Sequence, residues 1–234
     1  MNRAQLLDDS FQLARTKHLS YETALEISQY LTSEEDIVPW KAALNSFEYI
    51  VKMIKGNATS QVYINFKNYM FRLITPLYNS LGFEVSKTDS HMTLLKRKMV
   101  LDWLCQLDHP ECIEKSKQMF ALWMRNSTLN LIDANLRKVV YSTAVRHGGK
   151  EEHGFVLQQF KAETVDIEKE RMKAAILASG NEDLIKRFWN ETGPEKKSTN
   201  SQTAEEIIEI ARNNEWWIKN KIKMVTKWIQ KHVE

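Results

Sequence analysis

Hydrophobic residues recur at intervals of three or four positions along most of the chain, which predicts α-helices rather than strands. In the clearest case, the residues that would share one face of a four-turn helix are Trp40, Ala43, Leu44, Phe47, Val51 and Ile54. Pro39 suits the first turn of this helix, and Gly56 can end it. No stretch alternates convincingly with a period of two, so the pattern predicts an all-α protein.

Short turns separate about a dozen such segments, and short connections imply antiparallel neighbouring helices. The turns are predicted at residues 16–19, at Gly82, at residues 108–110 and at Gly148–Gly149. Pro76 lies inside a predicted helix and is expected to kink or end it. Because the chain has no strict repeat of fixed period, the predicted fold is a HEAT- or armadillo-like array of antiparallel helix pairs without a sheet.

One polar stretch interrupts this array. Residues 190–202 contain no hydrophobic side chain, which is typical of a linker. The predicted organisation is a helical array over residues 1–189, a polar linker over 190–203 and a terminal helix pair over 204–234.

The terminal pair combines a basic face with an apolar face. Lys219, Lys223 and Lys227 recur every four residues, opposite an apolar face formed by Ile218, Ile222, Val225 and Ile229. Such a helix can bind an anionic membrane or nucleic acid, but it more often caps a helical array and keeps its lysines in water. We therefore expect residues 204–232 to cover the helix at 181–189, whose apolar residues are Leu184, Ile185, Phe188 and Trp189.

Charge and length narrow the class of protein further. The 234 residues carry 33 Lys and Arg against 30 Asp and Glu, a formal net charge of +3. Residues 1–195 hold 25 basic and 25 acidic groups, and residues 196–234 hold 8 and 5. This balance argues against nucleic acid as a partner. No apolar run approaches about 18 residues, so we expect no transmembrane segment, and the N-terminal residues do not resemble a signal peptide.

Candidate catalytic chemistry is sparse. A zinc hydrolase helix needs the pattern H-E-x-x-H, and none of the six histidines is followed by Glu. His147 and His153, six residues apart across two glycines, are interpreted as surface histidines beside a turn. The charge run Glu168–Arg171 is interpreted as a solvated helix face. The sequence therefore predicts no catalytic residue, no metal ligand and no cofactor in this chain.

Cysteines and glycosylation sequons bear on the compartment. Cys105 and Cys112 could form a disulfide or remain two buried thiols, and His109 between them leaves a Cys/His pair conceivable. The sequon asparagines Asn57, Asn126 and Asn190 are candidate glycosylation sites. Taken together, these features favour the secretory pathway.

Several short motifs occur in an order that resembles one known domain. They are Asp8–Arg15, Leu19–Leu25, Val38–Leu44, Leu101–Cys105 with Cys112, Asn135–Tyr141, Glu168–Lys169, Asn214–Trp217 and Trp228–Ile229. This series resembles the C-terminal helical domain of zinc aminopeptidases of the aminopeptidase N type, which the endoplasmic reticulum aminopeptidases share. The resemblance implies a HEAT-like array, a secreted or membrane-anchored ectodomain and a Cys105–Cys112 disulfide.

The sequence also departs from this family. The zinc motif H-E-x-x-H and the substrate motif G-A-M-E-N of the family's catalytic domain do not occur in these 234 residues. His153 and Gly154 stand where the family usually has Trp-Asp, and several helix pairs that follow Trp189 in the family are replaced by the polar linker. The linker junction therefore resembles a deletion, a splice form or a gene model that joins distant exons.

The leading hypothesis is a non-catalytic helical domain that walls and gates the peptide chamber of a zinc aminopeptidase. Its expected partners are a peptide or an aminopeptidase catalytic domain, and a homodimer is possible. The alternative is a free-standing helical-repeat module that binds a protein or peptide. The zinc cofactor would belong to the family's catalytic domain and not to this chain.

Overall fold

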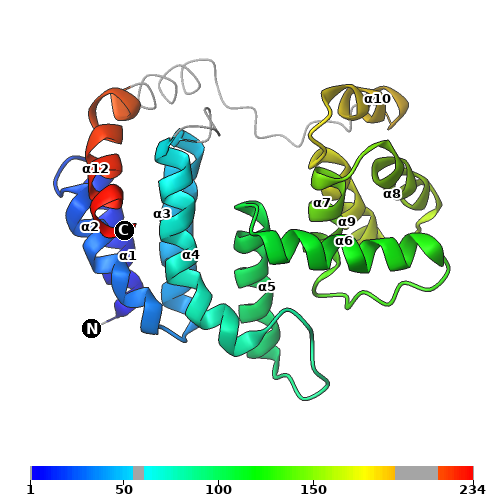
Figure 1. The fold of residues 1–234 in the computed structure, drawn as a ribbon, viewed down its shortest axis with the longest axis horizontal. Helices are drawn as coiled ribbons and strands as arrows, with labels where there is room; N and C mark the ends of the chain where they lie inside the picture. Colours follow the sequence, from blue (N-terminus) through cyan, green and yellow to red (C-terminus); the bar gives the residue numbers. More distant parts are fainter. Residues whose placement is uncertain (1, 55–60, 193–215, 234) are drawn as a thin grey trace. The chain divides into compact units, whose positions relative to one another are not determined.

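The structure, a computed structural model, describes residues 2–54, 61–192 and 216–233. Every element within these ranges is a helix and none of the residues described is in a strand, which confirms the predicted all-α class (Figure 1). The sequon at Asn57, the linker residues 193–203 and the predicted helix at Ile207 and Ile210 lie outside the described ranges. The chain forms two compact units, residues 1–80 with 200–234 and residues 81–199.

The first unit begins with helices α1 (Arg3–Arg15), α2 (Tyr21–Ser28), the 3-10 helix η1 (Gln29–Ser33), α3 (Ile37–Ile54) and α4 (Gln61–Leu81). Asn2 and Ser20 cap α1 and α2 by accepting hydrogen bonds from the backbone N–H groups of Ala4 and Glu22. Helix α1 packs against both α2 and α3. All six residues of the α3 stripe are buried, as predicted.

Helix α4 contains Pro76 and bends without ending there, one of the two outcomes expected for a proline inside a helix. The helix continues through Pro76 to Leu81 and changes direction in its C-terminal part (Figure 1). Gly82 then follows with φ +66°, a left-handed conformation that glycine adopts without strain, and the helix ends there as predicted. Leu73, Ile74 and Leu77 around the proline are buried, so packing offsets the lost backbone hydrogen bond.

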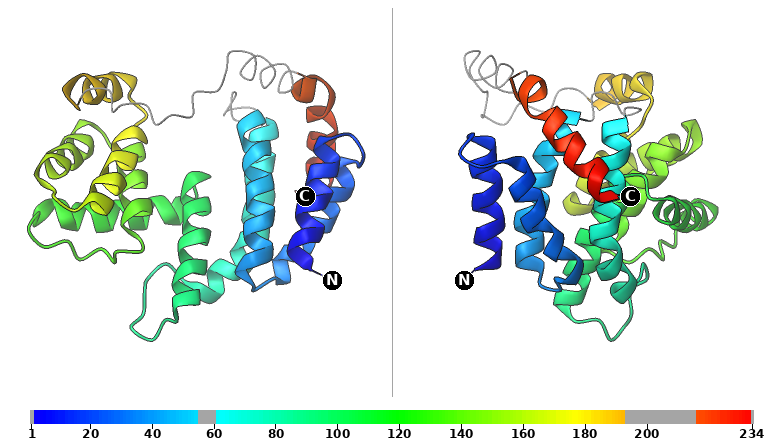
Figure 2. Two further views of the ribbon diagram at one scale, coloured as in Figure 1. Left: turned by 180° about the vertical axis from the view of Figure 1, so that it is seen from behind. Right: turned by 60° about the vertical axis from the view of Figure 1, so that its left-hand side comes forward.

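Two tryptophans from the end of the chain complete the first unit. Trp217 lies in a short helical segment at 216–220, and Trp228 lies in α12 (Ile222–Val233). The Trp217 ring lies 5.6 Å from the Tyr21 ring, and its Nε1 donates a hydrogen bond of 2.9 Å to the Tyr21 hydroxyl. Trp228 packs edge-on against Tyr69 at 5.4 Å between centroids. Figures 1 and 2 show α12 alongside α2.

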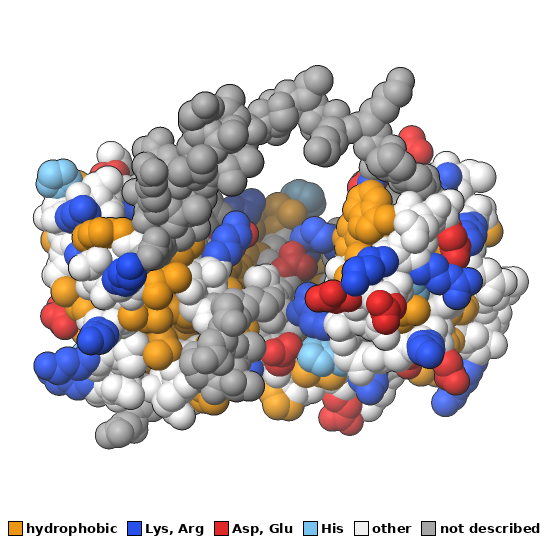
Figure 3. Space-filling model, turned by 90° about the horizontal axis from the view of Figure 1, so that it is seen from above, with side chains coloured by type: hydrophobic (Ala, Val, Ile, Leu, Met, Phe, Trp, Pro, Cys, Tyr) orange, Lys and Arg blue, Asp and Glu red, His pale blue; other side chains and the backbone are white. Residues whose placement is uncertain are grey.

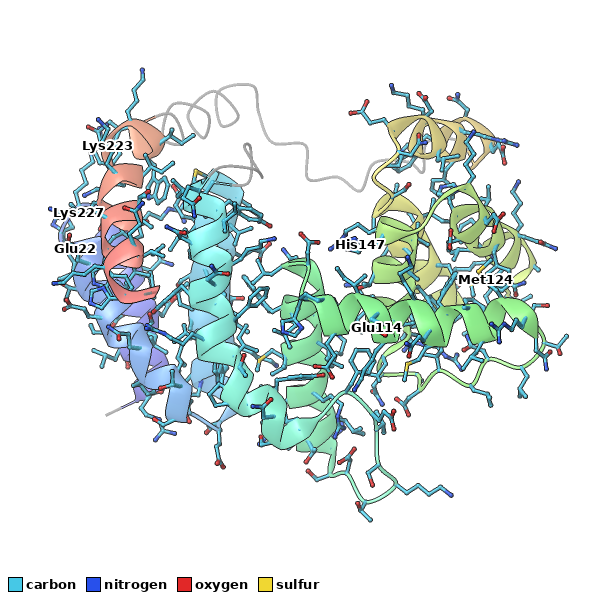
Figure 4. All side chains as sticks on the ribbon, viewed as in Figure 1. Glu22, Glu114, Met124, His147, Lys223 and Lys227 are labelled. Carbon is cyan, nitrogen blue, oxygen red and sulfur yellow. A yellow bond between two sulfur atoms is a disulfide. The ribbon has the colours of Figure 1, made fainter. Side chains whose placement is uncertain are left out.

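The described part of the tail docks within the first unit. The described part of the tail contacts α2, α3 and α4 of the first unit. Val225 and Ile229 are fully buried there, while Lys223 and Lys227 stay exposed on the side of α12 that faces away from α3 (Figure 4). The tail therefore closes the beginning of the helical series, because its apolar face fits the surface that α2 and α4 leave open.

The second unit contains α5 (His91–Gln106), α6 (Pro110–Arg125), α7 (Arg137–His147), α8 (Lys150–Ala162), α9 (Asp166–Leu177) and α10 (Glu182–Thr192). Ser90 caps α5, and Pro110 occupies the first position of α6. Helix α7 contacts α5, α6, α8 and α9. The second unit is thus centred on α7.

Helix α10 packs against α8 and α9 within the second unit. Phe188 is buried, and its ring lies 5.6 Å from that of Phe160 on α8. Trp189 remains 40% exposed. The helix also extends through Asn190 and Glu191 to Thr192, so the start of the predicted linker is helical.

The surface carries charges of both signs. On the face drawn in Figure 3, basic and acidic side chains are intermixed. This agrees with the balanced count of charges in the sequence.

Replacing Trp228 with alanine tests whether the tail docks as described. Trp228→Ala removes a side chain that is 4% exposed and should lower the free energy of unfolding of the first unit by about 3–5 kcal/mol, the usual cost of truncating a buried aromatic residue. Chemical denaturation followed by circular dichroism measures the change. Lys227→Ala, one residue away and exposed, is the control and should change stability by less than about 0.5 kcal/mol. Equal midpoints for Trp228→Ala and the wild type would show that the tail does not dock there.

Candidate functional site

The two cysteines lie where α5 turns into α6. Cys105 and Cys112 are joined by a disulfide, with a Cα–Cα distance of 5.3 Å, and both are buried. Asp108, in the turn between them, has φ +62°, and His109 is the N-cap residue of α6. Because both sulfur atoms are bonded to each other, neither is a thiolate nucleophile, and the Cys/His pair considered from sequence does not form.

The end of α7 lies against this turn. His147 Nε2 lies 3.2 Å from Asp108 Oδ1, and Arg146 Nη1 lies 3.4 Å from the Cys105 carbonyl oxygen. Partial burial lowers the pKa of His147, and Asp108 opposes this effect while Arg146 and Lys117 add to it. The imidazole is therefore mainly neutral at pH 7, and its contact with Asp108 is weaker than a full ion pair.

A buried carboxylate lies between α7 and α9. Glu168 is 5% exposed, so its interpretation as part of a solvated face is wrong. Its Oε1 accepts a 2.7 Å hydrogen bond from the Tyr141 hydroxyl, and its Oε2 lies 2.7 Å from Arg171 Nη1 and 3.3 Å from Arg137 Nη1. We call Glu168, Tyr141, Arg137 and Arg171 the Glu168 cluster. Its residues Arg137, Tyr141 and Glu168 come from two of the sequence motifs that carry the family resemblance.

The electrostatics of the Glu168 cluster favour the ionised carboxylate. Burial alone would raise the pKa of Glu168, but hydrogen bonds from Tyr141 and Arg171 and the charges of Arg137 and Arg171 together lower it. Burial, followed by the hydrogen bond to Glu168, raises the pKa of Tyr141, which stays a neutral donor. Asn130 Nδ2 donates to the Tyr141 hydroxyl at 2.5 Å, and the Trp123 ring stacks on the Tyr141 ring at 4.7 Å. The arrangement is a saturated structural network, because both carboxylate oxygens are occupied.

A second buried charge was missed by the sequence analysis. Arg97 is 3% exposed, and its Nη1 and Nη2 lie 2.6 and 3.3 Å from the two carboxylate oxygens of Asp89. It also donates to the carbonyl oxygens of Leu81 and Gly82, with Nη2 2.8 Å from the Leu81 oxygen. The arginine thus holds the loop between α4 and α5. The available signal was its helical register with Leu101 and Leu104, which places it on the buried face of α5.

His153 likewise differs from its expected position. It is 2% exposed rather than a surface histidine, and its Nε2 makes no hydrogen bond to any described residue. Burial first, and the charge of Arg187 second, lower the pKa of His153. The ring is therefore neutral at pH 7.

The remaining candidate sites are on the surface or outside the described residues. Asn126, at the C-cap of α6, and Asn190, in α10, are both exposed, which glycosylation requires. Within the described ranges no group of three or more His, Cys, Asp or Glu is arranged to hold a metal ion. Among the helices described, none has the length and hydrophobicity needed to cross a bilayer.

The disulfide gives a prediction about stability. The covalent link closes a ring over a sequence separation of 7, so the loop-closure estimate of its stabilisation is roughly 2–3 kcal/mol. The double variant Cys105→Ser/Cys112→Ser should unfold at correspondingly lower denaturant concentration. Non-reducing mass spectrometry of the wild-type protein, purified under oxidising conditions, should show the linked peptides, and two free thiols would contradict the assignment.

The Glu168 cluster gives a prediction about pH. Because the pKa of Glu168 is lowered in the folded state, its contribution is present above the unfolded-state pKa and is lost as pH falls through the folded-state pKa. Glu168→Gln should cost about 2 kcal/mol at pH 7, the order of a charged hydrogen bond, and should flatten the loss of stability below about pH 4.5. Glu170→Gln, exposed on the same helix, is the matched control. An acid profile identical to that of the wild type would refute the role of Glu168.

Comparison with known proteins shows which family and which proteins this chain resembles. The chain matches the model of the ERAP1-like C-terminal domain family over residues 1–234. It is 30% identical to mouse (Mus musculus) aminopeptidase N over 217 residues, which are 91% of this chain and 22% of that protein. It is also 30% identical to rat (Rattus norvegicus) glutamyl aminopeptidase over 188 residues, and to the membrane alanyl aminopeptidase of Manduca sexta over 190 residues.

The matched regions are 80% and 81% of this chain for the last two relatives, and 19% of each relative. The chain thus spans about a fifth of the length of these curated relatives. The family model covers every residue, and the motifs that form the disulfide turn and the Glu168 cluster fall within it. The chain belongs to the ERAP1-like C-terminal domain family of the zinc aminopeptidases.

Proposed function

We propose that this chain is a non-catalytic helical domain that walls the peptide chamber of a zinc aminopeptidase and gates access to it. The observation that carries this proposal is the match of the whole chain to the family's C-terminal domain, together with its coverage of only about a fifth of the relatives' length. The 234 residues contain neither H-E-x-x-H nor G-A-M-E-N. Peptide hydrolysis by these relatives would then depend on residues outside the region matched here.

The buried polar groups of the second unit support this role. A chamber wall must keep its helices in fixed positions while peptides of different sequence enter and leave. The disulfide turn fixes α5 against α6, Arg97 holds the preceding loop, and the Glu168 cluster ties α7 to α9. These groups make their contacts within the second unit. The Glu168 cluster and the disulfide are therefore better suited to holding the helices in place than to catalysis.

Three features support a secretory or extracellular location for the protein. The chain has a disulfide, which persists mainly in oxidising compartments. Asn126 and Asn190 are exposed and can accept glycans. One relative, from Manduca sexta, is named a membrane alanyl aminopeptidase. We infer that this chain is a glycoprotein of the same compartment.

The chain by itself should be inactive. We expect the purified 234-residue protein to hold no stoichiometric zinc and to cleave no amino-acid arylamide, because metal-assisted hydrolysis needs zinc ligands and a general base in one pocket. Metal analysis by mass spectrometry and a chromogenic assay test this. One zinc per chain, with hydrolysis abolished by a chelator, would contradict the proposal.

The molecule that this chain binds distinguishes the proposed chamber wall from the alternative, a free-standing module that binds a protein or peptide. A chamber wall should bind the part of mouse aminopeptidase N that precedes the region matched here, as measured by size-exclusion chromatography of the mixture. Saturable binding of peptides by this chain, without any complex with the catalytic part, would instead support the module.

A further inference from the structure

A basic cavity opens between α8 and α10 in the second unit. Its volume is about 400 Å³, within the range of pockets that hold small ligands. The cationic side chains that line it are Lys150, Lys161 and Arg187, and the apolar ones are Leu157 and Leu184. We call this site the α8–α10 cavity.

The charges around the α8–α10 cavity are only partly compensated. Lys161 Nζ lies 2.6 Å from Glu191 Oε2, and Arg187 Nε lies 2.7 Å from Glu191 Oε1, so one carboxylate serves two cations. No ion pair of Lys150 with any described residue is found. With His153 neutral, three positive charges therefore face one negative charge. The excess of two charges matches a dianion better than a carboxylate with a single charge.

Two neighbouring residues of α8, Gly154 and His153, form part of the cavity wall. At Gly154 an added Cβ would meet no atom within 4 Å, so the backbone of α8 borders open space there. His153, beside it in the lining, is buried and its Nε2 has no hydrogen-bond partner among the described residues. A buried polar atom without a partner is uncommon in folded proteins, and a bound ligand is one explanation for it.

We propose that the α8–α10 cavity binds a phosphate group, either free or esterified to a small organic body. Lys150, Lys161 and Arg187 bind the phosphate oxygens, while Leu157 and Leu184 contact the organic part. Glu191 keeps Lys161 and Arg187 in position in the absence of the ligand. Binding at this site requires no catalytic domain, so it is independent of the chamber-wall role.

Titration of the full 234-residue chain with phenyl phosphate, inorganic phosphate and benzoate tests this assignment. Calorimetry and the NMR shifts of α8 amides report binding. We expect saturable binding of phenyl phosphate, weaker binding of inorganic phosphate because it lacks the apolar part, and benzoate at least about tenfold weaker because it has one charge. Benzoate equal to phenyl phosphate, or no saturation by phenyl phosphate at about 10 mM, would overturn the proposal.

Two variants locate the site. Lys150→Gln removes the cavity cation that has no ion pair with a described residue, and should weaken phenyl phosphate binding about tenfold. Gly154→Leu fills the open space and should abolish binding, while the helix gains stability from losing a glycine. Lys138→Gln, on exposed α7 surface, changes the net charge equally and should leave the affinity within about twofold. Equal losses for Lys138→Gln and Lys150→Gln would show that binding reflects net charge only, and would refute the site.

Discussion

The burial of one apolar face per helix is the constraint on which this structure depends. A helix with a single hydrophobic stripe is stable only when a neighbour covers that stripe, so a series of helices needs cover at its ends. In the first unit this cover comes from the other end of the chain, through Trp217 against Tyr21 and Trp228 against Tyr69. The folding of residues 1–80 is therefore tied to a segment that lies more than 130 residues further along the sequence.

The helices themselves were predictable because their signals are local. The α3 stripe, the proline at the start of α6 and the glycine after α4 each act within a few residues, and the structure has all three. The partner of the terminal helix was not predictable in the same way. An amphipathic pattern shows that Val225 and Ile229 must be buried, but many helical surfaces could cover them. The sequence favours the surface formed by Leu184, Ile185, Phe188 and Trp189, and the structure shows that the ring of Phe188 lies against that of Phe160.

The burial of two charged residues in the second unit was not predicted, for a related reason. Glu168 and Arg97 stand in runs of charged residues that usually face water, and only their helical register suggests otherwise. Their burial depends on partners from other segments: Tyr141 and Arg137 for Glu168, and Asp89 with two backbone carbonyls for Arg97. His153 shows the opposite case. The sequence offers no reason to assign it a role, but in the structure it lines a basic cavity. Sequence alone therefore recovers the scaffold more fully than the sites on it.

Hydrogen exchange measured by mass spectrometry on the full chain tests most directly whether the end of the chain completes the first unit. Native segments that open together exchange with the same opening free energy. Amides of α12 should therefore be as protected as those of α4 around Tyr69, and both should lose protection together as denaturant is added. Exchange of α12 at the rate of an unstructured peptide, while α4 remained protected, would contradict the docking of the tail on the first unit.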